Sequence, residues 1–532
     1  MNSRKIRIFS IIMLGLLYFS SLQGQENKYW VFFSDKDGTT FNPMEYFDAK
    51  AIERRLIHGL NLNDISDYPV RKDYVKEIEK EVNKTGYSSR WFNAVSVIAT
   101  EMQIHNISKF PFVIDIQEQI IHTELCESLA PNVAPNSNIE LANKQMELMQ
   151  SELFSKNNIT GKGVRVAIFD GGFPEVDTHK AFEHVRKNNR IIKTWNFCNN
   201  KEFVYGYNSH GLSVMSNICG IYEGTQLGLA TEAEFLLART EVNTEPFAEE
   251  EWWLAAAEWA DKNGAHVINS SLGYTYHRYF PEQMDGKTSL VARAANMAAA
   301  KGIIVVNAMG NDGTNSWKAV GTPADADSVL SVGGIDPFTE YKINFSSFGP
   351  TVDGRLKPNV TNSGHAAVAK KKDKLGNAHG TSFASPLTCG FVACALQTMP
   401  ETKAMDMIRK IEKSGNLYPY YDYAHGYGIP QSSFFTKENK TTSEKQFDFI
   451  FQNDSLIVSL LPEETNNNTE LNKKSDKFLY YHIMLPDGKL FKYGLISVSE
   501  SEPLKLDLNE VPDNVTVRVL YKQYLKEWKN IK

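Results

Sequence analysis

Four short segments of the chain carry the residue types that acyl transfer requires. Asp170 ends one apolar, strand-like run and Asn311 follows another, while His210 and Ser382 each stand at the start of a helix-like run. Acyl transfer needs a nucleophile, a base, a group that orients the base and a donor for the oxyanion. These four residues supply one group of each type.

Each segment is common when it is taken alone. A strand that ends in Asp-Gly is usually a turn, a His before Gly is usually structural, and Gly-Thr-Ser at a helix start is usually an N-cap. All four, however, occur in one α/β region, each at a strand end or a helix start. Catalytic groups in such folds lie at the carboxyl ends of the strands, so the combination favours chemistry.

The elements that must position these residues lie in a middle region, residues 139–436. Short apolar runs there alternate with Ala-rich runs of helical spacing that end near Gly264 and Gly302. This alternation predicts an α/β fold with a mainly parallel sheet flanked by helices. The expected strands are 164–169, 234–238, 266–269 and 303–307, and the expected helices are 252–261 and 290–300.

The first 24 residues have the composition of a signal peptide. Basic residues precede a short apolar run, 8–19, and small residues follow it. We expect cleavage near Gly24 and a secreted or cell-envelope location. A membrane anchor is the alternative, but the apolar run is shorter than the ~20 residues that a spanning helix needs. No later stretch is long and apolar enough to span a membrane, so no span is expected after removal of the signal.

Residues 28–122 predict a small α+β domain without a catalytic cluster. Its expected elements follow the order strand, helix, strand, helix, strand, and a loop with Pro131 and Pro135 marks its end. The expected strands are 29–33, 91–99 and 112–116, and the expected helices are 44–58 and 101–109.

Residues 437–532 predict a small C-terminal β domain. A hairpin spans 478–496, and alternating valines at 515, 517 and 519 predict the final strand. The domain shows no chemistry, so it is interpreted as a stability module, with carbohydrate binding or sorting as alternatives.

Composition excludes several classes of protein. The 532 residues are 42% apolar and 23% charged, as in globular proteins, which excludes fibrous and wholly disordered chains. The net charge of -6 does not suggest a nucleic-acid partner. Five cysteines are too few for a dense disulfide framework and their spacing suits no zinc site. Cys198 and Cys219 are a candidate pair, and Cys389 and Cys394 are interpreted as buried small hydrophobes.

The motif Gly-Thr-Ser-Phe-Ala-Ser-Pro at 380–386 is the most specific signal in the chain, and it resembles the subtilisin-like serine proteases (subtilases). The order Asp, His, Ser is that of subtilisin. The intervals of 40, 101 and 71 residues along Asp170, His210, Asn311 and Ser382 also resemble those of the family. Segments 271–273 and 345–350 match as well. The resemblance covers about 140–436 and implies a subtilisin-like parallel sheet flanked by helices.

The resemblance implies a role for each matched residue in a secreted serine endopeptidase that acts on protein or peptide substrates. Ser382 would be the nucleophile, His210 the base, Asp170 its orienting group and Asn311 an oxyanion donor. Ser271, Leu272, Gly273 and Gly310 would bind substrate. Met309 would line the first specificity pocket or pack in the core. Residues 28–122 resemble the family's propeptide, which inhibits the enzyme until it is removed.

Departures from the family pattern leave alternatives open. Gly171 stands where Ser or Thr is usual, Leu212 where Thr is usual, and His379 where Asn is commoner, which makes His379 a rival base. The competing hypotheses are a catalytically impaired subtilase-fold protein that binds peptides, and an esterase. An α/β-hydrolase esterase would need Gly-x-Ser-x-Gly and another residue order.

Cofactors and specificity are less well marked than the catalytic residues. The sequence marks no cofactor with certainty, a structural calcium ion is left open, and no residue is assigned to a metal. Many subtilases bind calcium, for which Asp177, Asp325 and Asp327 are candidates, with solvated loop charges as the alternative. No acidic residue clearly marks the specificity pocket for basic side chains.

Overall fold

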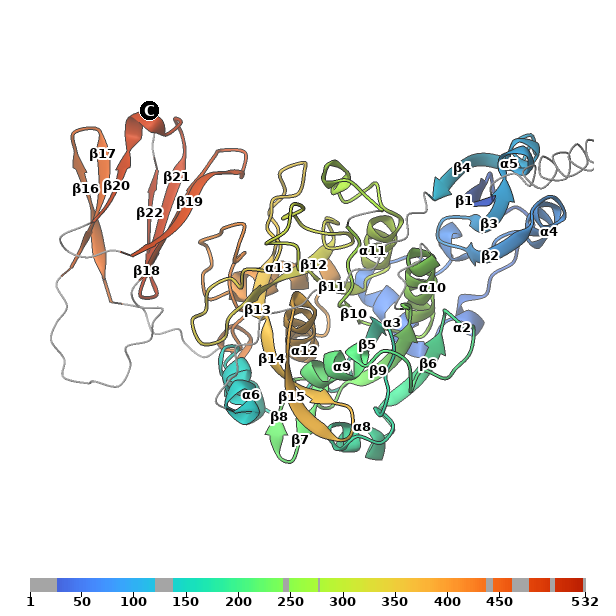
Figure 1. Ribbon diagram of the computed structural model, residues 1–532, viewed down its shortest axis with the longest axis horizontal. Coiled ribbons are helices and arrows are strands. Elements are labelled where there is room, and N and C mark those ends of the chain that lie inside the picture. Colours follow the sequence, from blue (N-terminus) through green and yellow to red (C-terminus); the bar gives the residue numbers. More distant parts are fainter. Residues whose placement is uncertain are drawn as a thin grey trace, which may run out of the picture.

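The computed structural model describes residues 26–119, 137–242, 248–275, 278–436, 444–461, 478–497 and 503–529. Three parts follow one another along its longest axis: an N-terminal α+β domain, a central α/β domain and a C-terminal β domain (Figure 1). The predicted signal peptide lies outside these ranges. Within them, no helix is long and apolar enough to cross a membrane.

A seven-stranded parallel sheet forms the centre of the α/β domain and confirms the predicted fold class. The strand order is β13-β12-β11-β10-β5-β9-β6, and every neighbouring pair is parallel. The strands are β5 (Arg165–Asp170), β6 (Ile191–Asn196), β9 (Glu234–Arg239), β10 (Val267–Ser270), β11 (Ile304–Ala308), β12 (Val329–Ile335) and β13 (Val360–Ser363).

Alternate residues of the strands feed two hydrophobic cores, one on each face of the sheet. Val166 and Ile168 of β5 pack in the core that contains helices α9 (His210–Cys219) and α12 (Thr381–Thr398). Ala167 and Phe169 pack in the core of helices α10 (Ala248–Lys262) and α11 (Leu290–Ala300). Because both faces are covered, these strands are apolar throughout rather than alternating.

Three strands of the sheet were not predicted from the sequence. The outer strand β6 contains Lys193 and Thr194 and is only partly buried, β12 contains Gly333 and Gly334, and β13 has four residues. None of them has the uninterrupted apolar character that identified β5, β9, β10 and β11. The remaining elements of the domain are α6 (Asn138–Glu147), α7 (Ser151–Lys156), α8 (Glu183–Lys187), β7 (Ile221–Tyr222), β8 (Thr225–Gln226), β14 (His365–Lys370), β15 (Lys374–His379), α13 (Ala404–Ser414) and α14 (Ser433–Thr436).

The N-terminal domain is an antiparallel sheet of order β2-β3-β1-β4 with helices packed on it. The predicted helix at 44–58 is wrong in one respect: it is broken at Phe47, and Asp48 caps the second half by accepting from the main-chain N–H of Lys50. Strand β2 and helix α4 were not predicted. The elements are β1 (Glu26–Phe33), α2 (Pro43–Tyr46), α3 (Ala49–His58), α4 (Lys72–Glu81), β2 (Lys84–Ser89), β3 (Ala94–Thr100), α5 (Glu101–Ile107) and β4 (Val113–Gln119).

The N-terminal and central domains share a hydrophobic core. Trp30 and Trp91 pack in the same buried cluster as Trp253 of α10. The buried carboxylate of Glu258, also on α10, accepts from Ser89 Oγ at 2.6 Å and from Tyr87 OH at 2.8 Å. The interface therefore buries both apolar side chains and hydrogen-bonded polar ones.

The C-terminal domain pairs a three-stranded antiparallel sheet, β16-β17-β20, with a four-stranded one, β19-β18-β21-β22. The prediction that the strand around 515–519 ends the fold is wrong, because β22 follows it and pairs with β21. The strands are β16 (Phe447–Gln452), β17 (Ser455–Leu460), β18 (Phe478–Met484), β19 (Leu490–Ser497), β20 (Leu504–Asp507), β21 (Thr516–Tyr521) and β22 (Tyr524–Lys529).

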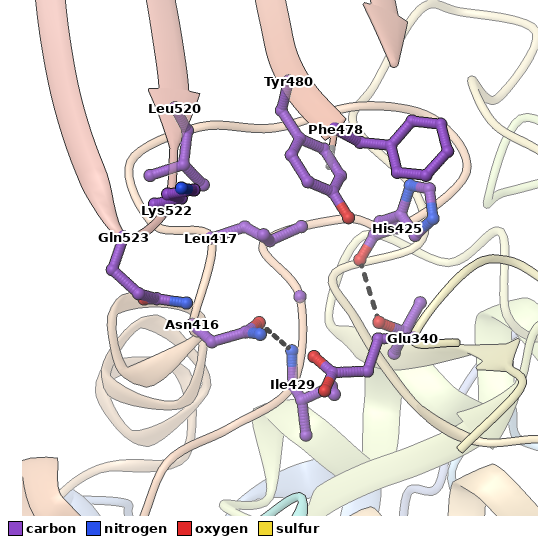
Figure 2. Close-up of a pocket in the computed structure, with 12 residues that line it drawn as sticks. Glu340, Asn416, Leu417, His425, Ile429, Phe478, Tyr480, Leu520, Lys522 and Gln523 are labelled. Carbon is purple, nitrogen blue, oxygen red and sulfur yellow. Dashed lines mark hydrogen bonds between the residues drawn. The ribbon is translucent and has the colours of Figure 1, made fainter. Parts of the chain in front are cut away.

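A tyrosine-rich loop of the central domain docks against the C-terminal domain. The main-chain N–H of Tyr421 donates to Nδ1 of buried His482 at 3.0 Å, and the ring of Tyr420 stacks on His482. A cavity of about 50 Å³ lies next to these residues. Among its lining side chains, Tyr480 faces Leu417 and His425 (Figure 2). These contacts hold the β domain to the central domain.

The candidate disulfide between Cys198 and Cys219 is not formed, and both thiols are free. Cys198 lies on the loop after β6, where its Sγ lies 3.8 Å from the carbonyl oxygen of Arg239, whereas Cys219 is buried at the end of α9. Cys389 and Cys394 are buried in the core, as their interpretation as small hydrophobes requires.

Candidate active site

Asp170 and His210 meet at the carboxyl end of the central sheet. Asp170 is the last residue of β5 and is fully buried, and His210 is the first residue of α9. The Asp170 Oδ2 and His210 Nδ1 atoms are 2.9 Å apart, and the main-chain N–H of Gly171 donates to Oδ1 at 2.7 Å. The carboxylate therefore keeps the proton of a neutral imidazole on Nδ1 and leaves Nε2 as the acceptor.

The surroundings of His210 favour its protonated form. Burial alone lowers the pKa of His210, but the charge of Asp170 and the hydrogen bond to it outweigh burial. The pKa of His210 is therefore raised above its ordinary 6.5. An imidazole with a raised pKa is a stronger base when it is neutral, which suits a group that accepts a proton during the reaction.

Close packing explains the glycines around this pair. A Cβ atom on Gly171 would lie 3.0 Å from Cβ of Asn208, and one on Gly211 would lie 3.0 Å from Cβ of Asp170. Both contacts are tighter than ordinary van der Waals distances. Asn208, in the loop before His210, leaves no room for a larger side chain at position 171. Leu212 is buried in the hydrophobic core beneath α9.

Ser382 lies in the first turn of α12, after Gly380, whose φ of +146° favours glycine. Its hydroxyl donates to the carbonyl oxygen of Ser271 at 3.1 Å. The ring of His210 is 5.5 Å from the ring of Phe383, the next residue. Among the described residues no hydrogen bond joins Ser382 to His210, so the structure brings their elements together but turns the hydroxyl towards Ser271.

Asn311 is held beside the start of α12 by its side-chain oxygen. Its Oδ1 accepts from the main-chain N–H of Thr381 at 2.9 Å and from the Thr381 hydroxyl at 3.0 Å. This arrangement leaves the Nδ2 donor close to the turn before the nucleophile, 3.6 Å from where a Cβ of Gly380 would lie. The amide can therefore donate to a group bound at Ser382.

A buried network that sequence reasoning missed ties Ser271 to the nucleophile. Ser271 Oγ donates to the carbonyl oxygen of Ser382 at 2.9 Å and accepts from Asn269 Nδ2 at 3.1 Å. Asn269 Oδ1 in turn accepts from Ser385 Oγ at 3.0 Å. The only sequence signal was an asparagine inside an otherwise apolar strand. The network fixes the end of β10 against the first turn of α12.

The other predicted substrate-binding residues lie on the two strand ends next to Ser382. The carbonyl oxygen of Leu272 accepts from Asn307 Nδ2 at 3.0 Å, and Gly273 is exposed. Gly310 has a φ of +111° and is half-buried. Met309, by contrast, is fully buried in an apolar cluster with Trp317 and Met284, so its side chain is core.

His379, the rival base, has another environment. Its ring stacks on His365 with centroids 4.0 Å apart, and burial lowers its pKa. No hydrogen bond to a carboxylate or to Ser382 is present at His379 among the described residues.

The candidate calcium ligands do not lie together. No group of three His, Cys, Asp or Glu in the described part of the chain could hold a metal ion.

Comparison with known proteins agrees with the fold. Subtilisin DY of Bacillus licheniformis is 27% identical over 282 residues, 52% of this chain and 93% of that protein. Serine protease AprX of Bacillus subtilis is 27% identical over 287 residues, 48% of this chain and 62% of that protein. The epidermin leader peptide processing serine protease of Staphylococcus aureus superposes with a TM-score of 0.54 at 17% identity, covering 79% of this chain and 100% of that one.

Two family models match the chain. The Bacteroidota Peptidase S8 propeptide domain matches residues 28–133, which include the N-terminal α+β domain. The subtilase family model, Peptidase S8, matches residues 161–428, about half of the chain, including the central sheet and all four residues proposed for chemistry. The chain belongs to the subtilase family.

Proposed function

We propose that the protein is a serine endopeptidase that hydrolyses peptide bonds in protein or peptide substrates. The observation that carries this proposal is the Asp170–His210 hydrogen bond at the sheet's carboxyl end, together with Ser382 in the first turn of α12. Membership of the subtilase family supports the same reaction.

Ser382 acts as the nucleophile and His210 as the base. A serine hydroxyl is a weak nucleophile at neutral pH, so Nε2 of His210 takes its proton as Oγ attacks the scissile carbonyl. The imidazolium then gives that proton to the leaving amine, and Asp170 stabilises the positive charge. The hydroxyl must first turn from the Ser271 carbonyl towards Nε2.

The oxyanion of the tetrahedral intermediate is stabilised at the start of α12. Asn311 Nδ2 and the main-chain N–H of Ser382 donate to it, and the helix N-terminus adds a favourable partial charge. The equivalent amide in subtilisin, a known case rather than a value worked out for this chain, is worth ~10²–10³ in turnover. The substrate lies as an extended strand along 271–273, where main-chain hydrogen bonds give affinity.

The N-terminal domain acts as the enzyme's own inhibitor until it is removed. It packs on α10 and α11 in a buried interface and corresponds to the family's propeptide. We place the maturation cut between 116 and 138, a stretch that lies largely outside the described residues. The predicted signal peptide directs the chain out of the cytoplasm. The enzyme then works in secreted or envelope-bound form.

A fluorophosphonate probe tests the nucleophile on protein made as the full chain, in which an added protease cuts the segment between 119 and 137 so that native protein and variants are compared in the same state. We expect labelling of the native protein, none of Ser382→Ala and strongly reduced labelling of His210→Ala. His379→Gln is the matched control because it removes the other imidazole near the nucleophile, and it should still label. Equal labelling of native protein and Ser382→Ala would refute the assignment of the nucleophile.

A second candidate function is a catalytically impaired subtilase-fold protein that binds peptides. The hydrogen bond of Ser382 to Ser271, in place of one to His210, is the observation that favours it. Under this alternative neither the native protein nor any variant reacts with the probe, although peptides still bind.

A further inference from the structure

The hairpin that leads to the nucleophile carries a lysine, Lys370, at the end of its first strand. Strands β14 and β15 form this antiparallel hairpin beside α9 and α12 (Figure 1). Lys370 ends β14 next to the turn at 371–373, and His379 ends β15 just before the first turn of α12, which contains Ser382. The hairpin therefore runs from that turn to the active site.

Side chains of the central domain fix the main chain around Lys370. Ser213 Oγ, on α9, donates to the carbonyl oxygen of Ala369 at 2.9 Å, and the main-chain N–H of Ala369 donates to Ser216 Oγ at 2.9 Å. Nε2 of His179 donates to the carbonyl oxygen of Lys370 at 3.1 Å. The Lys370 side chain therefore starts from a fixed point on the strand.

Gly376 of β15 makes room for the Lys370 side chain. A Cβ atom on Gly376 would lie 2.8 Å from Cγ of Lys370, 3.7 Å from its Cδ and 3.5 Å from its Cε. Gly376 is paired with Val368, which lies two residues closer to the active site than Lys370. The stem of Lys370 therefore runs along the hairpin in the direction of His379.

The ammonium of Lys370 acts on both imidazoles near the nucleophile. Burial and Asp170 have the largest effects on the pKa of His210, and the charge of Lys370 adds to the lowering. Burial and Asp336 have the largest effects on the pKa of His379, which the charge of Lys370 also lowers. An effect on both rings agrees with the direction of the stem and indicates that the ammonium lies on the side of His210 that faces the end of β15.

Lys370 has no acidic partner in the part of the chain that the structure describes. Asp373, the acid of the same hairpin, pairs with Lys180 at 3.2 Å instead. The side chain of Lys370 is half-buried, and this burial lowers the pKa of its amine. A partly dehydrated cation without a counter-ion is unfavourable, so a carboxylate brought next to it would be bound favourably.

The reaction of the proposed function brings the residues after the cut to this place. Because His210 gives its proton to the leaving amine, the first residue after the scissile bond begins beside Nε2 of His210. Segment 271–273 holds the residues before the cut, so the chain after the cut leaves on the other side of Ser382, past His379. The first two side chains on that path come within reach of the ammonium of Lys370.

We propose that Lys370 makes the enzyme selective for substrates with Asp or Glu at one of the first two positions after the scissile bond. This inference rests on the proposed function and names its substrate class. Four lysines between 370 and 374 look alike in the sequence, and only the fold turns Lys370 towards the site while the others are exposed. A charge-assisted hydrogen bond to a partly exposed amine corresponds to a preference of about tenfold over a neutral side chain.

The test measures kcat/KM of the enzyme, prepared as for the fluorophosphonate probe, on internally quenched peptides. The peptides are amidated at their C-termini and differ only at the first or the second residue after the cut, which is Glu, Asp, Gln, Leu or Lys. Mass spectrometry of the products confirms where each peptide is cut. At one of the two positions we expect Glu or Asp to exceed Gln by about tenfold and Lys to be the poorest.

Two variants of Lys370 and one control test the origin of this preference. Lys370→Met keeps the length of the side chain but removes its charge, so Glu and Gln peptides should be cleaved equally well. Lys370→Glu should reverse the order and favour Lys after the cut, because like charges repel. A general loss of activity cannot mimic this reversal, since the peptides are compared on the same enzyme.

Lys371→Met is the matched control. Lys371 is the next residue and is exposed in the turn of the hairpin, so its substitution should leave the ratios unchanged. A native enzyme without preference for Asp or Glu, or a preference that survives in Lys370→Met, overturns the inference.

The fluorophosphonate probe separates the failure of this inference from the failure of the proposed function. If Ser382 is labelled but no acidic peptide is cleaved faster than its neutral counterpart, the role of Lys370 is wrong and the peptidase stands. If no peptide is cleaved and Ser382 is not labelled, both the peptidase and the role of Lys370 are refuted.

Discussion

Arg54 of the N-terminal domain contacts the ends of two helices of the central domain, so replacing it tests what holds the two domains together. Its guanidinium is almost fully buried and donates to the carboxylate of Asp261, to the carbonyl oxygen of Ala265 and, at 3.0 Å, to that of Lys301. Helices α10 and α11 end at Lys262 and Ala300. A cation at two helix C-termini is stabilising because it satisfies orphan carbonyls and opposes the negative ends of the dipoles.

Arg54→Met keeps the length of the side chain and removes these hydrogen bonds. Breaking a buried ion pair by removing one partner costs about 3–5 kcal/mol. Arg55 still donates to both oxygens of Asp261, at 2.9 and 2.7 Å, so we expect the lower end of that range. At 1.4 kcal/mol per factor of ten, about 3 kcal/mol corresponds to roughly 10²-fold weaker binding of the N-terminal domain.

The assay uses the full chain in a Ser382→Ala background, so that the protein does not cut itself. A recognition site for an added protease replaces part of the segment between 119 and 137. After that segment is cut, size-exclusion chromatography follows the release of the N-terminal domain. Arg71→Met is the matched control, because Arg71 pairs with Asp73 inside the same domain at 2.5 Å and makes no contact with the central domain among the described residues.

The expected result is release roughly 10²-fold faster in Arg54→Met, mostly in the dissociation rate, and unchanged in Arg71→Met. Circular dichroism before the cut must show both variants folded. If the two variants release the domain at the same rate, the buried guanidinium does not hold the interface and the reasoning is wrong.

Three further predictions concern histidines. The value of kcat/KM should rise with pH through a pKa above 6.5, because His210 acts as a neutral base and Asp170 favours the charged form of His210. Asp170→Asn should move this rise in kcat/KM to lower pH. A rise at unchanged pH would contradict the pairing of Asp170 with His210. Burial and the charge of the neighbouring His379 lower the pKa of His365 to about 4, whereas the unfolded value is 6.5, so this neutral imidazole stabilises the fold above pH 6.5 and loses that contribution as pH falls towards 4. The loss is at most about 3 kcal/mol, so thermal melts of His365→Gln at pH 7.5 and 4.5 should differ less than those of the parent; an equal difference would contradict it. His482→Leu removes the partner of the Tyr421 main chain and should weaken docking of the C-terminal domain by about 1–3 kcal/mol, seen as faster hydrogen exchange in β18; unchanged exchange would show that the contact is dispensable.

The pattern of neighbouring residues was sufficient to predict the inner strands of the central sheet that are apolar throughout. Strands β5, β9, β10 and β11 are buried on both faces, so each is a short apolar run that can be read without knowing its neighbours. Strands β6 and β13 lie at the two edges of the sheet and were missed, because edge strands need not be apolar.

Contacts between residues that lie far apart in the chain could not be predicted from such local patterns. Arg54 reads as an ordinary charge on an amphipathic helix, yet its partners Asp261 and Lys301 lie more than 200 residues along the chain. Met309 was equally compatible with a pocket or a core. Periodicity says which face of an element is apolar, but not which other element covers it.

By itself the sequence determined the parallel α/β class and supplied Asp170, His210, Asn311 and Ser382 at strand ends and helix starts, because hydrophobic periodicity and turn residues are properties of neighbouring positions. Only the tertiary structure decided that the Ser382 hydroxyl faces Ser271 and that Arg54 reaches two helix termini. Those outcomes depend on which surfaces pack together, and that is set by the whole chain rather than by any one segment.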